Sequence, residues 1–277
     1  MADRLKEHIY HYDEIVIGNN LSAILYAYER DCYFIYNTSQ NMCPLDSIGL
    51  SIKLGEELYP PDTKKRTIAA ELVYDLVLKG KSSVSGKIQA IRVEDEEIKV
   101  ITENSKLIKI KYDKLRIFNL DKISSLPIHV RESTTDYRVL DWYDVKSGMK
   151  HEHDFLTDNS SSFVNKIHFY TSERIDGNTR GYKDLVAESL LDRDQINDAS
   201  YSDSISRLKI LDMMKEAGIT GTGNGKDTKG RQRYLPIKIE LSRREVFPNR
   251  KISCEEESEK IIIDTRELEE IYRSLNE

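Results

Sequence analysis

The segment Tyr12–Asn37, which reads YDEIVIGNNLSAILYAYERDCYFIYN, decides the fold. Its segment 13–17, Asp-Glu-Ile-Val-Ile, ends in an apolar run that stops at Gly18, as a buried parallel strand does before a tight turn. Apolar residues then recur at helical spacing, and a second β-rich run follows at 33–36. Strand, turn, helix and strand in such close succession predict a right-handed crossover unit with two parallel strands.

The pattern changes twice further along the chain. A helix is predicted at 67–80, followed by strand-like runs near 88–93, 98–102, 107–111 and 115–119 that indicate a β-meander. After residue 120 the sequence mixes both types of element without a βαβ rhythm. Strands are predicted in YRVLDWYDVKSG, FVNKIHFYTSE, LPIKIELSRREVF and KIIIDT, and helices in KDLVAESLLD, SDSISRLKILDMMKEAG and RELEEIYRSLN.

These elements resemble a known family. The first 120 residues are similar to the FAD-type Rossmann domain of two-dinucleotide-binding flavoproteins, in which a meander leads to a strand preceded by Tyr-Asp, here Tyr112-Asp113. The second half resembles the substrate region of the amine-oxidase and UDP-galactopyranose mutase branch, through Arg207 in a helix-like segment and the IKIE strand at 237–240. The fold class expected is α/β. A Rossmann-like sheet with a β-meander fills 1–120, and an α+β region at 121–277 packs back on it.

The resemblance implies FAD and a set of residues that contact it. Gly18 corresponds to the first glycine of the G-x-G-x-x-G turn and Ala23 to the third, while Asn20 replaces the second, beside Asn19. Asn37 stands where the family has an acidic residue for the ribose hydroxyls. The late glycine-Asp motif that closes over the ribityl chain has no counterpart in 240–277.

Two functions are compatible with these departures. The first is a degenerate flavoprotein relative that binds a nucleotide or a protein partner without turnover. The alternative is an FAD-dependent oxidoreductase or mutase-like enzyme acting on a small or sugar-like substrate. A visible absorption spectrum of the purified protein separates them, because bound flavin colours the protein.

Two arginines of the second half are candidate substrate-binding residues. Arg174 and Arg207 carry guanidinium groups that can hold a phosphate or carboxylate with two parallel hydrogen bonds. Local pairing with Asp176 and Asp203 is the structural alternative.

Charge and composition argue against several classes of protein. The net charge of −6, with 32% charged and 39% hydrophobic residues, argues against broad affinity for nucleic acid or membranes. Three cysteines without a C-x-x-C pair fit a reducing compartment, and we expect a cytoplasmic protein.

Two further motifs lack the residues that their chemistry needs. The cluster HEHD at 151–154 has too few partners for a metal site, so no metal is expected. GTGNGKDT resembles a P-loop but follows a helix and has Asp227 where Ser or Thr is required. We therefore interpret 218–233 as a basic glycine-rich surface loop, with an anion-binding loop as the alternative.

Overall fold

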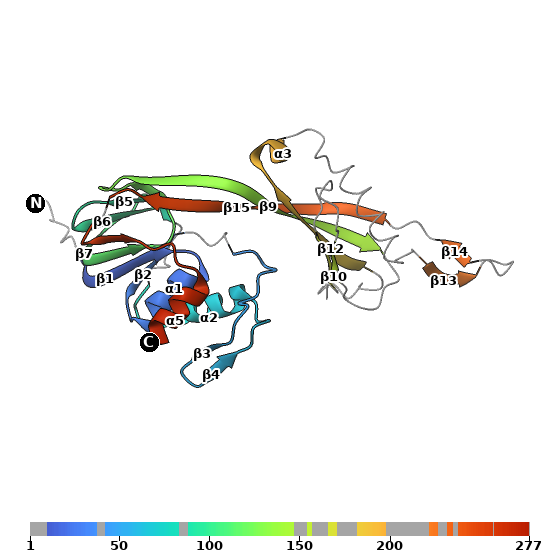
Figure 1. Cartoon of the computed structure of the whole chain (residues 1–277), viewed down its shortest axis with the longest axis horizontal. Helices are drawn as coiled ribbons and strands as arrows, with labels where there is room; N and C mark the ends of the chain where they lie inside the picture. Colours follow the sequence, from blue (N-terminus) through green and yellow to red (C-terminus); the bar gives the residue numbers. More distant parts are fainter. Residues whose placement is uncertain are drawn as a thin grey trace, which may run out of the picture. The chain divides into compact units, whose positions relative to one another are not determined.

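The chain forms two compact units (Figure 1). Unit 1 comprises Met1–Glu132 and Ile252–Glu277, and unit 2 comprises Ser133–Lys251. The computed structural model describes residues 10–37, 42–82, 88–146, 154–156, 166–170, 182–197, 222–226, 232–234, 238–256 and 258–276.

Parallel strands form the centre of unit 1. β1 (Tyr10–Gly18) lies between β2 (Tyr33–Tyr36) and β7 (Leu107–Ile117), and β16 (Ile261–Ile263) pairs with the last residues of β7. The register places Gly18 opposite Tyr36 and Ile17 opposite Ile117, so the carboxyl ends of these strands lie at one edge. The predicted crossover unit is confirmed, and with it the α/β class.

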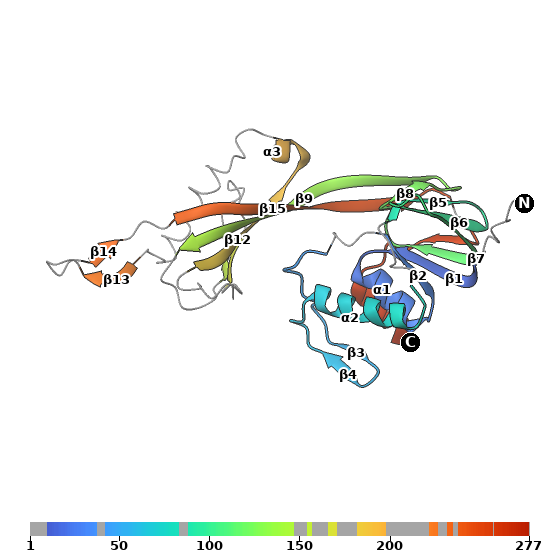
Figure 2. The ribbon, with the colours of Figure 1, turned by 180° about the vertical axis from the view of Figure 1, so that it is seen from behind.

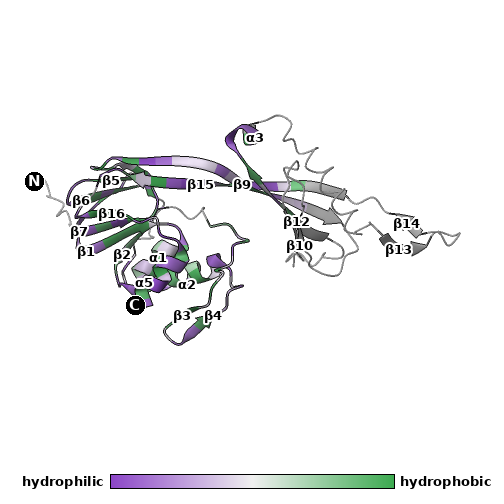
Figure 3. Cartoon of the chain, in the orientation of Figure 1, coloured by the Kyte–Doolittle hydropathy of each residue, from purple (hydrophilic) through white to green (hydrophobic). Residues whose placement is uncertain are grey.

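An antiparallel meander continues the same sheet. β5 (Ile88–Val93) pairs with β6 (Glu97–Thr102), β6 pairs with the first half of β7, and β8 (Ile123–Ser125) runs parallel to β5. The runs expected at 107–111 and 115–119 are one continuous strand, because β7 pairs with β1 from Ile110 to Ile117 and does not turn at Tyr112-Asp113. Hydrophobic and hydrophilic residues alternate along these strands (Figure 3).

Three helices of the described region cover one face of this sheet (Figure 2). α1 (Leu21–Glu29) packs against α2 (Lys65–Leu78) and α5 (Leu268–Asn276), which confirms the helices expected near 67–80 and at the C-terminal end. A hairpin of β3 (Ile52–Leu54) and β4 (Glu57–Tyr59) precedes α2. Val16 belongs to the core between sheet and helices, whereas Ile15 and Ile17 belong to the core on the opposite face. This burial on both faces explains the continuous apolar run of β1.

Unit 2 contains an antiparallel sheet in the order β10-β11-β12-β9-β15. Its elements are β9 (Val130–Lys146), β10 (Asp154–Leu156), β11 (Lys166–Tyr170), β12 (Tyr182–Leu191) and β15 (Lys238–Cys254), with the short helix α3 (Arg193–Asn197) after β12. The ends of β9 and β15 extend into unit 1.

Two expectations in unit 2 were wrong. KDLVAESLLD is not a helix, because β12 pairs with β9 from Tyr182↔Lys146 to Leu191↔Tyr137 and with β11 on its other side. The glycine-rich segment at 218–233 is not entirely a loop. Within it β13 (Thr222–Lys226) pairs with β14 (Gln232–Tyr234), which extends just beyond it, so strand hydrogen bonds outweigh the local preference of glycine for turns.

The C-terminal residues belong with unit 1. The division expected from the sequence, after residue 120, differs from the observed one because β16 pairs with β7 and α5 packs against α1. None of the helices in the described residues is long and apolar enough to cross a membrane.

Candidate functional site

The candidate site lies at the carboxyl edge of the parallel strands in unit 1. Gly18 ends β1, Asn37 follows β2, and Asn119 follows β7 after one residue. Ligands of open α/β sheets bind at this edge, where strand ends and helix N-termini meet.

Gly18 allows α1 to pack closely against β1. A Cβ atom at this position would lie 2.5 Å from the Cβ of Ala23 and 3.2 Å from that of Phe118. The close approach of α1 to β1 therefore depends on the absence of a side chain at Gly18 and on the small side chain of Ala23. Both are explained by contact between helix and strand, so their contact with a cofactor stays a prediction.

Asn20 caps the N-terminus of α1. Its backbone is extended, with φ −95° and ψ 164°, and its side chain Oδ1 accepts a hydrogen bond from the amide of Ala23 at 2.9 Å. An asparagine therefore makes this turn without a left-handed conformation, and it satisfies one of the amides that a helix start leaves open. The amides of Leu21 and Ser22 have no intrahelical partner and belong to the same helix start.

A network of amide and carboxylate side chains joins the strand ends. Asn19 donates from Nδ2 to Oδ2 of Asp121 at 2.9 Å and accepts from Nδ2 of Asn119. Asn37 donates from Nδ2 to Oδ1 of Asn119 at 2.7 Å and to the carbonyl oxygen of Asp121 at 2.6 Å. The segment after β7 is thereby fixed to the ends of β1 and β2. The sequence pattern did not reveal Asn119 and Asp121, because their partners lie about a hundred positions away.

Asn37 retains one polar atom without a partner. The residue is 2% exposed, both hydrogens of its Nδ2 are donated within the network, and its Oδ1 is a buried acceptor with no hydrogen bond among the described residues. Such atoms are uncommon in folded proteins and require a donor from water or a ligand. A hydroxyl group would supply that donor.

A buried ion cluster lies between the sheet and the helices. Arg116 donates from Nε to Glu14 at 3.1 Å and from Nη1 to Asp264 at 2.7 Å, and its guanidinium lies 4.3 Å from the ring centroid of Tyr26. Arg266 holds both carboxylate oxygens of Asp264, at 2.9 and 2.6 Å. The cluster connects β1, β7 and the C-terminal segment.

Asp264 directly follows β16 at the same edge of the sheet. Burial acts to raise the pKa of its carboxyl group, but hydrogen bonds from Arg266 and Arg116 outweigh this and lower the pKa below its ordinary value. Its side chain is 3% exposed. An aspartate at the end of a parallel strand is well placed to bind a ligand. Both oxygens of Asp264 accept hydrogen bonds from arginines, however, so we interpret it as a structural residue.

The two predicted substrate-binding residues, Arg174 and Arg207, fall outside the described part of the chain. So do His151, Glu152 and His153 of the HEHD cluster, at which no metal is expected. Among the residues that the structure describes, no group of three or more His, Cys, Asp or Glu side chains could hold a metal ion. The anion-binding and metal expectations for these residues stay predictions.

Comparison with solved structures identifies the fold. The myxobacterial chondrochloren halogenase CndH, an FAD-dependent halogenase, aligns with a TM-score of 0.55 at 6% identity, over 92% of this chain and 68% of its own. The flavin-dependent brominase Bmp2 aligns with a TM-score of 0.50 at 8% identity, over 91% and 71%. No protein-family model matches the sequence. No curated protein matches it either. At these identities the likeness shows the flavoprotein fold alone, and the amine-oxidase and mutase branch stays a prediction.

The residues at the edge can accept the ADP half of FAD. The start of α1 offers amides to a pyrophosphate, as helix N-termini do. The unpartnered Oδ1 of Asn37 suits a ribose hydroxyl, which can donate to it. One of the amides at this helix start, that of Ala23, already donates to the side chain of Asn20. A phosphate oxygen that binds this amide would have to displace that side chain.

Proposed function

We propose that the carboxyl edge of unit 1 binds FAD through its ADP half and that the chain is an FAD-dependent oxidoreductase or mutase-like enzyme. The observation that carries this is Asn37 Oδ1, a buried acceptor that lacks a donor at the edge where dinucleotide folds bind ribose. The flavoprotein fold supports it. A small or sugar-like substrate, expected from the resemblance, is part of the proposal.

A second candidate is a flavoprotein shell that binds a nucleotide or a protein partner without turnover. The cap formed by Asn20 favours it, because the chain itself satisfies an amide that a phosphate would otherwise occupy. The bonds that Asn19 makes to Asn119 and Asp121 also hold the edge together without a ligand. Both candidates use the same edge of the sheet. They differ in whether the protein binds flavin there and whether the bound flavin can be reduced.

A change in the ligand tests the Asn37 contact without disturbing the protein. Calorimetry should show that ADP binds and that an ADP analogue lacking both ribose hydroxyls binds about tenfold more weakly, the effect of one hydrogen bond to a buried group. In Asn37→Ala the two ligands should bind equally. If the parent protein binds both equally, a water molecule is the partner of Oδ1 and the contact is refuted.

Flavin binding itself separates the two candidates. Titration with FAD should change the visible spectrum of the flavin, and a reducing nicotinamide or dithionite should bleach the bound form. Binding of ADP without any binding of FAD would support the shell without turnover and exclude the flavoenzyme.

A further inference from the structure

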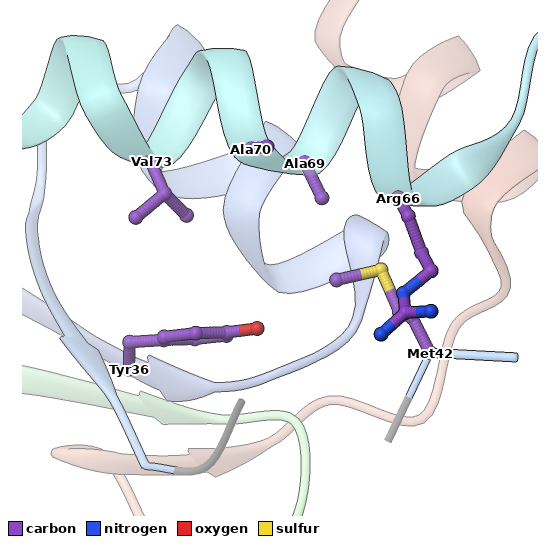
Figure 4. Close-up of a pocket in the computed structure, with 6 residues that line it drawn as sticks. All are labelled: Tyr36, Met42, Arg66, Ala69, Ala70 and Val73. Atoms are coloured by element: carbon purple, nitrogen blue, oxygen red, sulfur yellow. The ribbon is translucent and has the colours of Figure 1, made fainter. Parts of the chain in front are cut away.

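Another feature of unit 1 that can hold a ligand is a pocket beneath α2. It has a volume of about 240 Å³ and is lined by Tyr36, Met42, Arg66, Ala69, Ala70 and Val73. Figure 4 shows the ring of Tyr36 facing α2, with its hydroxyl end directed toward Arg66 and Met42. Tyr36 packs with the core on the helical side, whereas Asn37 bonds at the strand edge. The pocket is therefore formed by different side chains from the site described above.

The size and the walls of the pocket define what fits. A cavity of about 150 Å³ holds benzene, and drug-sized ligands occupy about 300 Å³ or more. A volume near 240 Å³ accordingly admits one ring with a small substituent. The flat ring of Tyr36 opposes the small aliphatic side chains of Ala69, Ala70 and Val73, so the gap between them suits a planar group.

One end of the pocket is positively charged. Arg66 makes no ion pair or side-chain hydrogen bond with the described residues, and none of the six lining residues is acidic. It lies in the first turn of α2, where there is no acidic residue and the N-cap Lys64 makes no side-chain cap. The helix start therefore adds its partial positive charge to that of the guanidinium. Tyr36 contributes a hydroxyl donor at the same end.

We infer that this pocket binds a small planar anion, a single ring that carries a carboxylate or phosphate group. The ring lies between Tyr36 and α2, and the anionic group meets the guanidinium of Arg66 and the hydroxyl of Tyr36. Two kinds of ligand can place an anionic group of this size in the pocket: a free aromatic acid, or a nucleotide of which the pocket holds only a part.

Calorimetry with benzoate tests the inference. Benzoate should bind the parent protein, and the neutral amide benzamide, which has the same ring, should bind at least about tenfold more weakly. Arg66→Gln should weaken benzoate about tenfold. The matched control is Lys65→Gln, which removes the same charge from the adjacent residue of the same turn without altering the lining, and it should change the affinity less than about twofold.

A second variant tests the cavity itself. Ala70 is exposed and its side chain lines the pocket, so Ala70→Leu should fill space and abolish benzoate binding while the unfolding temperature stays within a few degrees of the parent. Absence of saturable benzoate binding up to about 10 mM would overturn the inference. Equal loss in Arg66→Gln and Lys65→Gln would overturn it as well, because it would indicate attraction by charge at a distance.

Competition with ADP distinguishes the two sources. If ADP displaces benzoate and Arg66→Gln also weakens ADP, the pocket holds part of a nucleotide. If ADP binds without displacing benzoate, the occupant is a free acid and the two sites are separate. If ADP binds the parent and the Arg66 variant equally while benzoate does not bind, the inference fails and the proposed function stands.

Discussion

At the scale of single residues, the hydrogen bonds of Asn37 differ from those that the resemblance to flavoproteins implies. The resemblance to flavoproteins suggests that an acidic residue there would improve ribose binding. The structure indicates a different outcome, because Nδ2 of Asn37 donates to two oxygen acceptors, on Asn119 and Asp121. An amide is required at this position whatever the ligand.

We therefore expect Asn37→Asp to destabilise the protein by about 1–3 kcal/mol, the cost of leaving buried acceptors without donors. The substitution places a carboxylate against two oxygens and adds a buried charge. Urea denaturation measures the change in the free energy of unfolding. Asn104→Asp, at an exposed position, is the matched control and should have little effect. Equal stability of parent and Asn37→Asp would contradict the network.

The close packing of α1 on β1 at Gly18 leaves no room for a side chain. The Cβ added by Gly18→Ala meets the Cβ of Ala23 at 2.5 Å, so the helix must move away from the strand, at a cost of about 1–3 kcal/mol. Removing the opposing atom in the double variant Gly18→Ala, Ala23→Gly should recover part of this loss. Denaturation curves of the two single variants and the double variant form a cycle. Strict additivity of the two effects would refute the contact.

The free energy of unfolding should depend on pH through the carboxyl group of Asp264. Its pKa is lowered in the folded state, so its contribution is fully present above the unfolded value of about 3.9 and is lost as the pH falls through the folded pKa. Asp264→Asn should cost about 3 kcal/mol at neutral pH, because it leaves Arg116 and Arg266 without their shared carboxylate. Unfolding free energies from pH 7 to pH 2 should show a smaller decline in the variant. Parallel curves would exclude this role.

At the scale of elements, local pattern predicted the first crossover unit because its signals agree. The apolar run, the glycine and the helical spacing all lie within Tyr12–Asn37, and the strand, turn and helix that they predict form from residues close together in the sequence. β12 shows the opposite case, since KDLVAESLLD has helix-forming residues yet pairs with β9 and β11. Strand pairing with distant partners outweighs a helix propensity of a few tenths of a kcal/mol per residue.

α5 is predicted to be essential for unit 1. Ile271 is 0% exposed and belongs to the core shared with α1 and α2, so Ile271→Ala should cost about 2–5 kcal/mol. Leu78→Ala in α2 removes similar atoms from a side chain that is 67% exposed and should cost less than about 0.5 kcal/mol. Urea denaturation compares them. A small effect at Ile271 would mean that α5 is not held in the core.

At the scale of the whole molecule, the candidate site depends on segments that are far apart in the sequence. Asn19 bonds to Asp121, and Arg116 bonds to both Glu14 and Asp264. No local pattern encodes such contacts, since each residue reads as an ordinary polar position within its own segment. The glycine turn and Asn37 could therefore be found from the sequence, while the network that surrounds them could not.

The chain leaves unit 1 after Glu132 and returns to it at Ile252. Near the two points where the chain leaves and re-enters unit 1, Arg131 pairs with Glu255 at 3.2 Å, and the amide of His129 bonds to Glu256 at 3.0 Å. The two ends are thus close enough to be joined by a linker of about four glycine and serine residues in place of 133–251.

The shortened protein should fold, because unit 1 contains the complete core of β1, β2, β7 and β16 with α1, α2 and α5. Circular dichroism and urea denaturation should show a cooperative transition that Ile271→Ala weakens as it does in the full chain. The ADP half of the proposed site is formed by Gly18, Asn20 and Asn37, all in unit 1, so calorimetry should give the shortened and full proteins the same affinity for ADP within about threefold. A folded unit 1 that no longer binds ADP would show that residues 133–251 contribute to the site, and an unfolded one would show that the two units depend on each other.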